Sequence, residues 1–491
     1  MVFPRLNGLR LPTTIGPATW IMGGRTLGFI AAFAIPLVLA RCFDPEQFGT
    51  YRQLFLIYST CYGIAQVGMA ESLYFFLPRH PESAGRWIAN ALAVLGAAGL
   101  ACLVAAQVAA PWLAREFHNA ALTQGLPTIA LMLALTLVAT PPEIVMISRR
   151  QHRLAAVTFA GSDIARAVLL TVPAAVTHRL DALLMGAVVF GLLRCGLVAV
   201  YLRHELRGLF HFDAALLLAQ LRYALPFGVA VAIGVVQLNL HQYAVASWFD
   251  PATFAIYSVG CLQVPFVDIL MTSVANVMMV TMGEHMRREQ APVALWQDTV
   301  RRLAFVFVPL ATLLILCAHD VIVTLFTQTY AGAAPVFTAF TLTIVLAALP
   351  VDAVLRAYAE TRFLLWMNVL QLVFVASTIA WFVATWHLLG AVLVTVVSMT
   401  MAKALAVHRI ARLMRVDLRD VLPWRQLAGT VAAAALAAVP VVFIKARFIT
   451  PPLLTLLISG AVYGLAYLVL AAGSGVLQGV HPAVEPEVPA A

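Results

Sequence analysis

Three arginines lie inside long apolar stretches of this sequence, and their side chains could bind phosphate. They are Arg25, Arg166 and Arg194. A permanent charge at the centre of a bilayer costs roughly 2.5–3.5 kcal/mol on insertion scales, so such a residue needs a partner, water or a ligand. A guanidinium can hold two phosphate oxygens in one planar fork. Arg25, Arg194 and Arg166 are therefore candidates for binding a phosphate group.

Acidic residues in similar stretches offer a structural explanation for the same arginines. Glu71 lies at a depth similar to that of Arg25 on the neighbouring predicted helix, so the two could form an ion pair. Asp163 and Arg166 are three residues apart, a spacing that brings side chains together on one helix face. Asp163 could instead neutralise Arg194. The sequence leaves the ligand and the ion-pair interpretations open, and the two are not exclusive.

Uncharged polar residues and one further acid complete the candidate set. Gln237, Asn239 and His241 lie together in one apolar stretch, where they predict a wet cavity with hydrogen-bonding groups. Alternatively, His241 is held by a hydrogen bond between helices. Asp268, near Pro265, is an embedded acid that could take up a proton. With Asp268 included, three embedded acids balance the three embedded arginines, so no cationic cavity follows from the count alone.

The composition determines which kind of element must position these residues. Of 491 residues, 62% are hydrophobic and only 11% are charged, whereas soluble domains have roughly 45–50% apolar and 25% charged residues. The chain is therefore expected to be an all-α polytopic membrane protein. The net charge of +9 comes from short basic clusters between apolar runs, as orientation signals do, so no nucleic-acid partner is expected. The cysteines form no disulfide or zinc pattern, and no cofactor is expected.

Windows of about 20 apolar residues predict fourteen transmembrane helices. They lie near residues 18–40, 53–77, 87–110, 124–147, 154–176, 181–202, 224–247, 254–282, 303–325, 334–355, 363–385, 389–408, 427–448 and 453–474. The break between the eleventh and twelfth rests on the turn-like residues from His387 to Gly390.

The distribution of basic residues predicts the orientation. With the N-terminus inside, twenty-one Arg residues fall on the inside and six Lys and Arg residues on the outside. Inside loops carry the excess of Lys and Arg, so both termini are expected to be cytoplasmic. Lys403 lies close enough to the inside surface for its ammonium group to reach the interface.

An internal repeat predicts two homologous halves. Residues 43–51 read FDPEQFGTY and residues 249–257 read FDPATFAIY, at an offset of 206. Because each half starts on the cytoplasmic side, the halves are expected to be parallel repeats. Asp44 and Asp250 are expected to cap the helices that follow them.

The repeat also predicts the domain organisation. It comprises an N-terminal six-helix lobe (1–203), a cytoplasmic interfacial linker (204–222) with Asp213 near the start of its helix, and a C-terminal six-helix lobe (223–415). An additional helix pair (416–475) and a disordered tail (476–491) follow.

Short loops and missing motifs argue against an enzyme or an ATP-driven pump. No predicted external segment exceeds about fifteen residues, and the sequence contains no P-loop, HExxH, CxxC or GxSxG site. Duplicated membrane halves around a central cavity are instead typical of alternating access.

Three segments carry a family resemblance. ESLYFFLPR (71–79), FDPEQFGTYRQ (43–53) and YSVGCLQVPFVDILMTSVANVMM (257–279) resemble bacterial polysaccharide biosynthesis proteins of the oligosaccharide-flippase type, such as the Wzx O-antigen flippases. That family belongs to the multidrug/oligosaccharidyl-lipid/polysaccharide exporter superfamily. The resemblance covers roughly residues 10–415, and the final helix pair fits fourteen-helix members. It implies two six-helix lobes forming a V, without covalent chemistry.

The resemblance also implies a substrate, partners and a location. The expected activity is the translocation of an undecaprenyl-diphosphate-linked oligosaccharide across the bacterial inner membrane by alternating access, for O-antigen or exopolysaccharide biosynthesis. The expected partners are this lipid-linked oligosaccharide, membrane lipid, and a polymerase with other glycan-export proteins. For this substrate, Arg25, Arg194 and Arg166 are the candidates for binding the diphosphate, and the cavity near Gln237, Asn239 and His241 could hydrogen-bond the sugars.

A cation-coupled small-molecule exporter of the multidrug-extrusion type is the alternative. Organic cations would need buried carboxylates, whereas a diphosphate would need arginines. The antiporter relatives suggest that Asp268 is a protonatable site that couples transport to an H⁺ or Na⁺ gradient.

Overall fold

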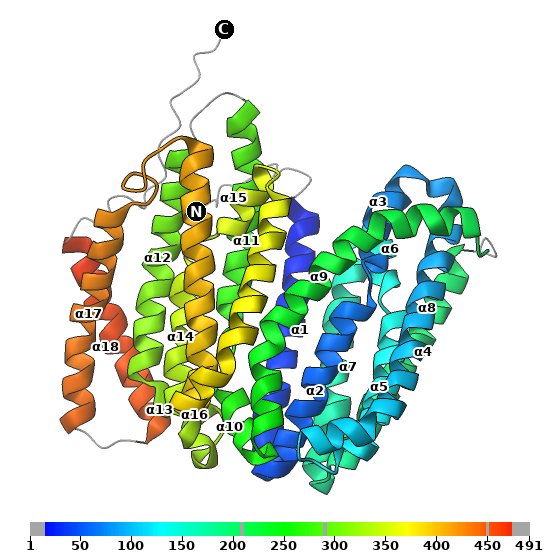
Figure 1. The fold of residues 1–491 in the computed structure, drawn as a ribbon, viewed down its shortest axis with the longest axis horizontal. Coiled ribbons are helices and arrows are strands. Elements are labelled where there is room, and N and C mark those ends of the chain that lie inside the picture. Colours follow the sequence, from blue (N-terminus) through cyan, green and yellow to red (C-terminus); the bar gives the residue numbers. More distant parts are fainter. Residues whose placement is uncertain (1–14, 207–210, 288–291, 448–450, 474–491) are drawn as a thin grey trace, which may run out of the picture. The chain divides into compact units, whose positions relative to one another are not determined.

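The computed structural model describes residues 15–206, 211–287, 292–447 and 451–473, and within them every regular element is a helix (Figure 1). The α-helices are α1 (Ile15–Cys42), α2 (Pro45–Ala65), α3 (Met69–Arg79), α4 (Ala84–Glu116), α5 (Leu122–Val138), α6 (Pro141–Ser148), α7 (His152–Thr177), α8 (Leu180–Leu206), α9 (Ala214–Trp248), α10 (Pro251–Gly260), α11 (Pro265–Arg287), α12 (Val293–Leu316), α13 (Ala318–Leu325), α14 (Ala334–Ala347), α15 (Val351–Ala357), α16 (Thr361–Met414), α17 (Trp424–Arg447) and α18 (Pro452–Gly473). Two 3₁₀ turns, η1 (Pro81–Ser83) and η2 (Gln328–Ala333), complete the set.

Twelve helical stretches of the described chain are long and apolar enough to cross a membrane. This confirms the predicted all-α polytopic fold. Local breaks explain the difference from fourteen. Helix α16 merges two predicted spans, although its backbone leaves the helical region at His387 (φ 51°, ψ −131°), where the turn was expected. The predicted span 53–77 is divided into α2 and α3 because Val67 and Gly68 have positive φ angles of 49° and 70°.

The chain divides into two compact units, Met1–Ala255 and Ile256–Ala491. Within the first unit, α1 packs along α7, α8 packs on α5 and α7, and α9 packs on α2, α3 and α4. A buried cluster that includes Met69, Leu73, Trp87 and Leu133 forms part of the core of this unit. Helix α9 is continuous across position 222, where the linker was expected to end, and the predicted tail 476–491 lies outside the described residues.

The start of α9 is fixed to α4 by a reciprocal pair of hydrogen bonds. The buried Asn90 side chain donates to the Asp213 carbonyl (2.9 Å) and accepts from the Asp213 backbone N–H (3.0 Å). Asp213 caps α9 as predicted, by accepting from the backbone N–H groups of Ala215 and Leu216. The hydrogen bond from Leu216 is the main reason that the pKa of Asp213 lies below its usual value. These contacts attach the start of α9 to α4 within the first unit.

The second unit contains the C-terminal helix pair, α17 and α18, which packs on α12 and α13. Lys445 donates to the carboxylate of Asp320 (2.6 Å) and to the carbonyl of Leu316 (2.8 Å). In the same unit, Lys403 donates to the carbonyl of Leu349 (2.8 Å). The Lys403 ammonium is thus held by a backbone carbonyl beside the break between α14 and α15, and its extension to the interface stays a prediction.

Candidate functional site

Close packing of α1 on α7 places Arg25 at the edge of the first unit. A Cβ atom at Gly24 would lie 2.5 Å from the carbonyl oxygen of Ala156, and one at Gly28 would lie 2.3 Å from the carboxylate of Asp163. Glycine is therefore required at position 24, where the neighbouring atom belongs to the α7 backbone, whereas at position 28 the Asp163 side chain would have to move. Arg25 lies between these contacts in the sequence and is exposed, with its guanidinium 4.9 Å from the centre of the Phe159 ring.

Arg25 does not form the expected ion pair with Glu71. Among the ion pairs between residues that the structure describes, none includes either side chain. One carboxylate oxygen of Glu71 is buried without a hydrogen-bond partner. Within the described residues, Arg25 is therefore not neutralised by a direct contact with a carboxylate.

Arg166 has the structural partner that its spacing allowed. Its guanidinium lies 2.9 Å from the carboxylate of Asp163. Both side chains are about 29% exposed, so the pair is only partly removed from solvent. The i,i+3 interpretation is confirmed for these two residues, and Asp163 is bound to Arg166 rather than to Arg194.

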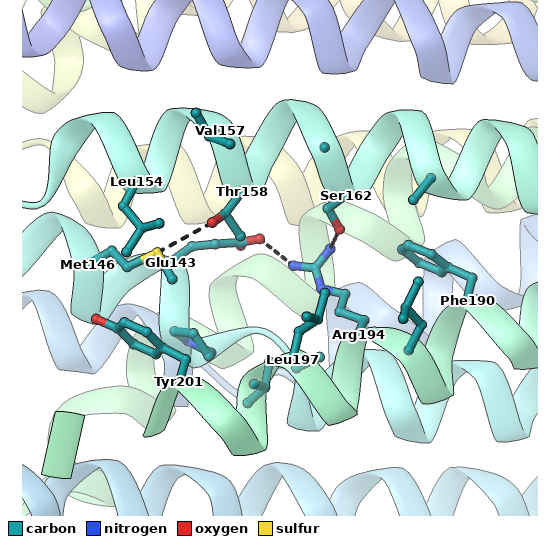
Figure 2. Close-up of a pocket in the computed structure, with 16 residues that line it drawn as sticks. Glu143, Met146, Leu154, Val157, Thr158, Ser162, Phe190, Arg194, Leu197 and Tyr201 are labelled. Carbon is teal, nitrogen blue, oxygen red and sulfur yellow. Dashed lines mark hydrogen bonds and ion pairs between the residues drawn. The ribbon is translucent and has the colours of Figure 1, made fainter. Parts of the chain in front are cut away.

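Arg194 is bound by a residue that the sequence analysis did not consider. Its guanidinium donates to the carboxylate of Glu143 on α6 (2.5 Å) and to the hydroxyl of Ser162 on α7 (2.8 Å), as Figure 2 shows. The side chains of Arg194 and Glu143 are only 19% and 12% exposed. The missed signal was a glutamate inside the apolar stretch 124–147, directly after two prolines.

A cavity of about 440 Å³ lies beside this ion pair, between α6, α7 and α8. Glu143, Arg194, Ser162 and Thr158 contribute polar atoms, and apolar side chains form most of the remaining wall (Figure 2). The size falls within the roughly 300–1,000 Å³ that is common for small-molecule sites. The charged pair in its wall is largely neutralised, so the cavity itself favours an apolar ligand.

The remaining candidates are distributed between the two units. Gln237, Asn239 and His241 lie on α9 in the first unit, where Asn239 donates to the hydroxyl of Thr60 (3.1 Å). His241 is buried, with 4% of its surface exposed. Asp268 lies in the first turn of α11 in the second unit and is exposed. The structure therefore brings Arg25, Arg166, Arg194 and their acidic neighbours into one unit, and leaves Asp268 in the other.

Comparisons with known proteins agree with this fold. The model of a family described as "Polysaccharide biosynthesis protein" matches residues 38–335. The chain resembles the lipid II flippase MurJ in an inward closed conformation, with a TM-score of 0.71, 11% identity, and coverage of 94% of this chain and 99% of that chain. It also resembles an inward-facing multidrug resistance MATE family transporter of the MOP superfamily, with a TM-score of 0.63, 14% identity, and coverage of 84% of this chain and 97% of that chain. For a MOP superfamily transporter from Pyrococcus furiosus the TM-score is 0.53 and the identity 11%, with coverage of 82% of this chain and 95% of that chain. No curated protein matches the sequence significantly.

Proposed function

The chain belongs to the polysaccharide biosynthesis protein family, whose model spans more than half of it, and on this premise we propose that it is a flippase for lipid-linked oligosaccharides. It is a multi-pass membrane protein with the fold of MOP-superfamily transporters. The proposed substrate is an undecaprenyl-diphosphate-linked oligosaccharide, moved across the bacterial inner membrane by alternating access for O-antigen or exopolysaccharide synthesis. Both termini would be cytoplasmic, and polymerases would use the product.

The observation that carries this proposal is the environment of Arg25. Arg166 and Arg194 each contact a carboxylate at 2.9 and 2.5 Å, respectively. The Arg25 guanidinium instead lies over the ring of Phe159. The side chain is exposed, on a helix that is long and apolar enough to cross a membrane. An exposed cation at that position attracts an anion that enters the membrane region, and a diphosphate provides oxygens for both arms of the guanidinium.

The packing of α1 supports the same role. Gly24 packs directly on the backbone of Ala156 and Gly28 on the Asp163 side chain, so the backbone that carries Arg25 is fixed on one side. The side chain itself remains exposed. A fixed backbone lowers the entropic cost of orienting a binding group. Arg166 and Arg194, which are paired with Asp163 and Glu143, would contribute to diphosphate binding only through the electrostatic field of these pairs. Transport would be coupled to an H⁺ or Na⁺ gradient.

Binding of undecaprenyl diphosphate to the detergent-solubilised protein tests the proposal. Arg25→Ala should weaken binding by about tenfold to a hundredfold, because a hydrogen bond to a charged group contributes roughly 1.5–3 kcal/mol. Arg41→Ala is the matched control, since Arg41 is an exposed arginine in the last turn of the same helix. Undecaprenol, which lacks the diphosphate, should bind both proteins equally. Equal binding of the diphosphate by wild type and Arg25→Ala would contradict the proposed role.

A cation-coupled small-molecule exporter is the second candidate, and Glu71 favours it. A carboxylate oxygen buried without a hydrogen-bond partner is a feature expected of a site that takes up a proton or an organic cation. Under this alternative, Glu71→Gln would abolish export of an organic cation driven by a proton gradient, whereas Arg25→Ala would leave it unchanged.

A further inference from the structure

The cavity between α6, α7 and α8, here called the α6–α8 groove, opens on the outer surface of the first unit. Leu154 and Val157 of α7 and Leu193 and Leu197 of α8 line it, yet they are 45%, 66%, 48% and 64% exposed. Both helices meet the criteria for crossing a membrane. Large apolar side chains exposed on such helices face hydrocarbon, so the groove opens toward lipid tails rather than toward water.

The polar groups in the wall do not prevent an apolar occupant. The Arg194 guanidinium is neutralised by Glu143 and also donates to Ser162, so a hydrocarbon chain would meet a compensated pair. Thr158 directs its hydroxyl toward the sulfur of Met146 (3.7 Å). The sugar part of a glycolipid would find few hydrogen-bond partners here, whereas an acyl chain needs none.

One end of the groove is marked by positive charge. Tyr201, which lines the groove, donates to the side chain of Gln151 (3.0 Å), and Arg149 forms an ion pair with Glu205. These contacts bring the turn between α6 and α7 to the end of α8. Arg150, which lies in that turn between Arg149 and Gln151, is exposed at this end. An anionic headgroup would complement it.

From the apolar channel and the basic end together, we infer that the α6–α8 groove binds an anionic diacyl phospholipid. One acyl chain occupies the groove and the phosphate lies near Arg150. This lipid is a bound component of the protein and is not the transported substrate, so the inference stands apart from the transport proposal.

Native mass spectrometry of delipidated protein titrated with phosphatidylglycerol tests the groove. Gly161 lines it, and a Cβ atom there would meet nothing within 4 Å. Gly161→Leu should therefore fill the groove without disturbing helix packing, and should remove the tightest phosphatidylglycerol adduct. Gly196→Leu is the matched control, because Gly196 lies on α8, is equally open, and does not line the groove. Gly161→Val provides a smaller change if the leucine variant is not monodisperse.

Two further experiments test the headgroup preference of the groove and the position of the acyl chain. Wild type should prefer phosphatidylglycerol over phosphatidylcholine of the same chains by about fivefold, the ratio expected for one interfacial arginine, and Arg150→Gln should abolish the preference. Phosphatidylglycerol with a photoreactive acyl chain should label peptides that contain Val157 and Leu197. Unchanged adducts in Gly161→Leu, equal binding of both lipids, or tighter binding of undecaprenyl phosphate than of phosphatidylglycerol would overturn the inference.

Discussion

Gly49 and Pro251 lie in direct backbone contact, since a Cβ atom at Gly49 would fall 1.8 Å from the carbonyl oxygen of Pro251. Each residue belongs to one copy of the repeated FDP segment. The two segments therefore touch each other within the first unit, through Gly49 and Pro251. Asp44 and Asp250 cap the following helices as predicted, through the backbone N–H groups of Gln47 (2.8 Å) and Thr253 (3.0 Å). The full two-repeat layout stays a prediction.

This contact predicts the effect of adding one methyl group. Gly49→Ala should destabilise the protein by about 1–3 kcal/mol, the usual cost of overpacking, because the backbone of α2 or of Pro251 must move. Gly234→Ala on α9 is the control, since its Cβ would meet nothing within 4 Å. It should be neutral or slightly stabilising. Thermal unfolding in detergent measures both, and an equal Tm for the two variants would show that the contact is not tight.

Replacement of Arg25 should stop glycan export without preventing insertion. Arg25→Ala removes the exposed guanidinium, and Arg25→Lys should restore export only partly because an ammonium cannot form the bidentate fork. Export is measured in a strain that lacks the native copy, with protein amount checked by immunoblot. If the double variant Arg25→Leu with Glu71→Leu exports fully, neither charge contacts the substrate.

The Arg194–Glu143 pair should behave as a buried structural ion pair. Arg194→Leu or Glu143→Leu alone leaves one uncompensated charge and should cost about 3–5 kcal/mol. The double variant Arg194→Leu with Glu143→Leu should recover most of the loss, because apolar replacements often substitute for a buried pair. Thermal unfolding of the three variants checks this. Additive losses in the double variant would contradict the coupling that the 2.5 Å contact implies.

The asymmetry of basic residues predicts the topology. Reporter domains fused after residue 212 and at the C-terminus should both be read as cytoplasmic, because twenty-one basic residues fall on one side and six on the other. A C-terminal reporter on the external side would contradict the prediction that the chain crosses the membrane an even number of times.

The sequence was sufficient for the properties that depend on local chemistry. Hydropathy located the membrane-length helices of the described chain, but it also predicted 53–77 as one span, which the structure divides into α2 and α3. Asp-Pro pairs located the helix starts at Pro45 and Pro251. The Asp163–Arg166 pair followed from helical spacing. Contacts between distant residues could not be derived in this way. Glu143 and Arg194 are 51 residues apart and meet only because α6 and α8 pack in the same unit.

The same limit explains why Arg25 and Glu71 were not resolved from sequence. Similar depth on neighbouring helices suggested a pair, but depth does not determine the rotation of either helix. Gly24 and Gly28 fix the rotation of α1 against α7, and this leaves Arg25 exposed beside Phe159.

Flipping by the purified protein in proteoliposomes tests the central claim most directly. A fluorescent undecaprenyl-diphosphate oligosaccharide is placed in both leaflets, and an impermeant quencher reports the fraction that becomes accessible from outside. We expect wild type and Arg41→Ala to make the protected inner fraction accessible, and Arg25→Ala to leave it protected. If wild type leaves the labelled lipid protected but expels an organic cation under a proton gradient, the flippase proposal is contradicted and the exporter alternative is supported.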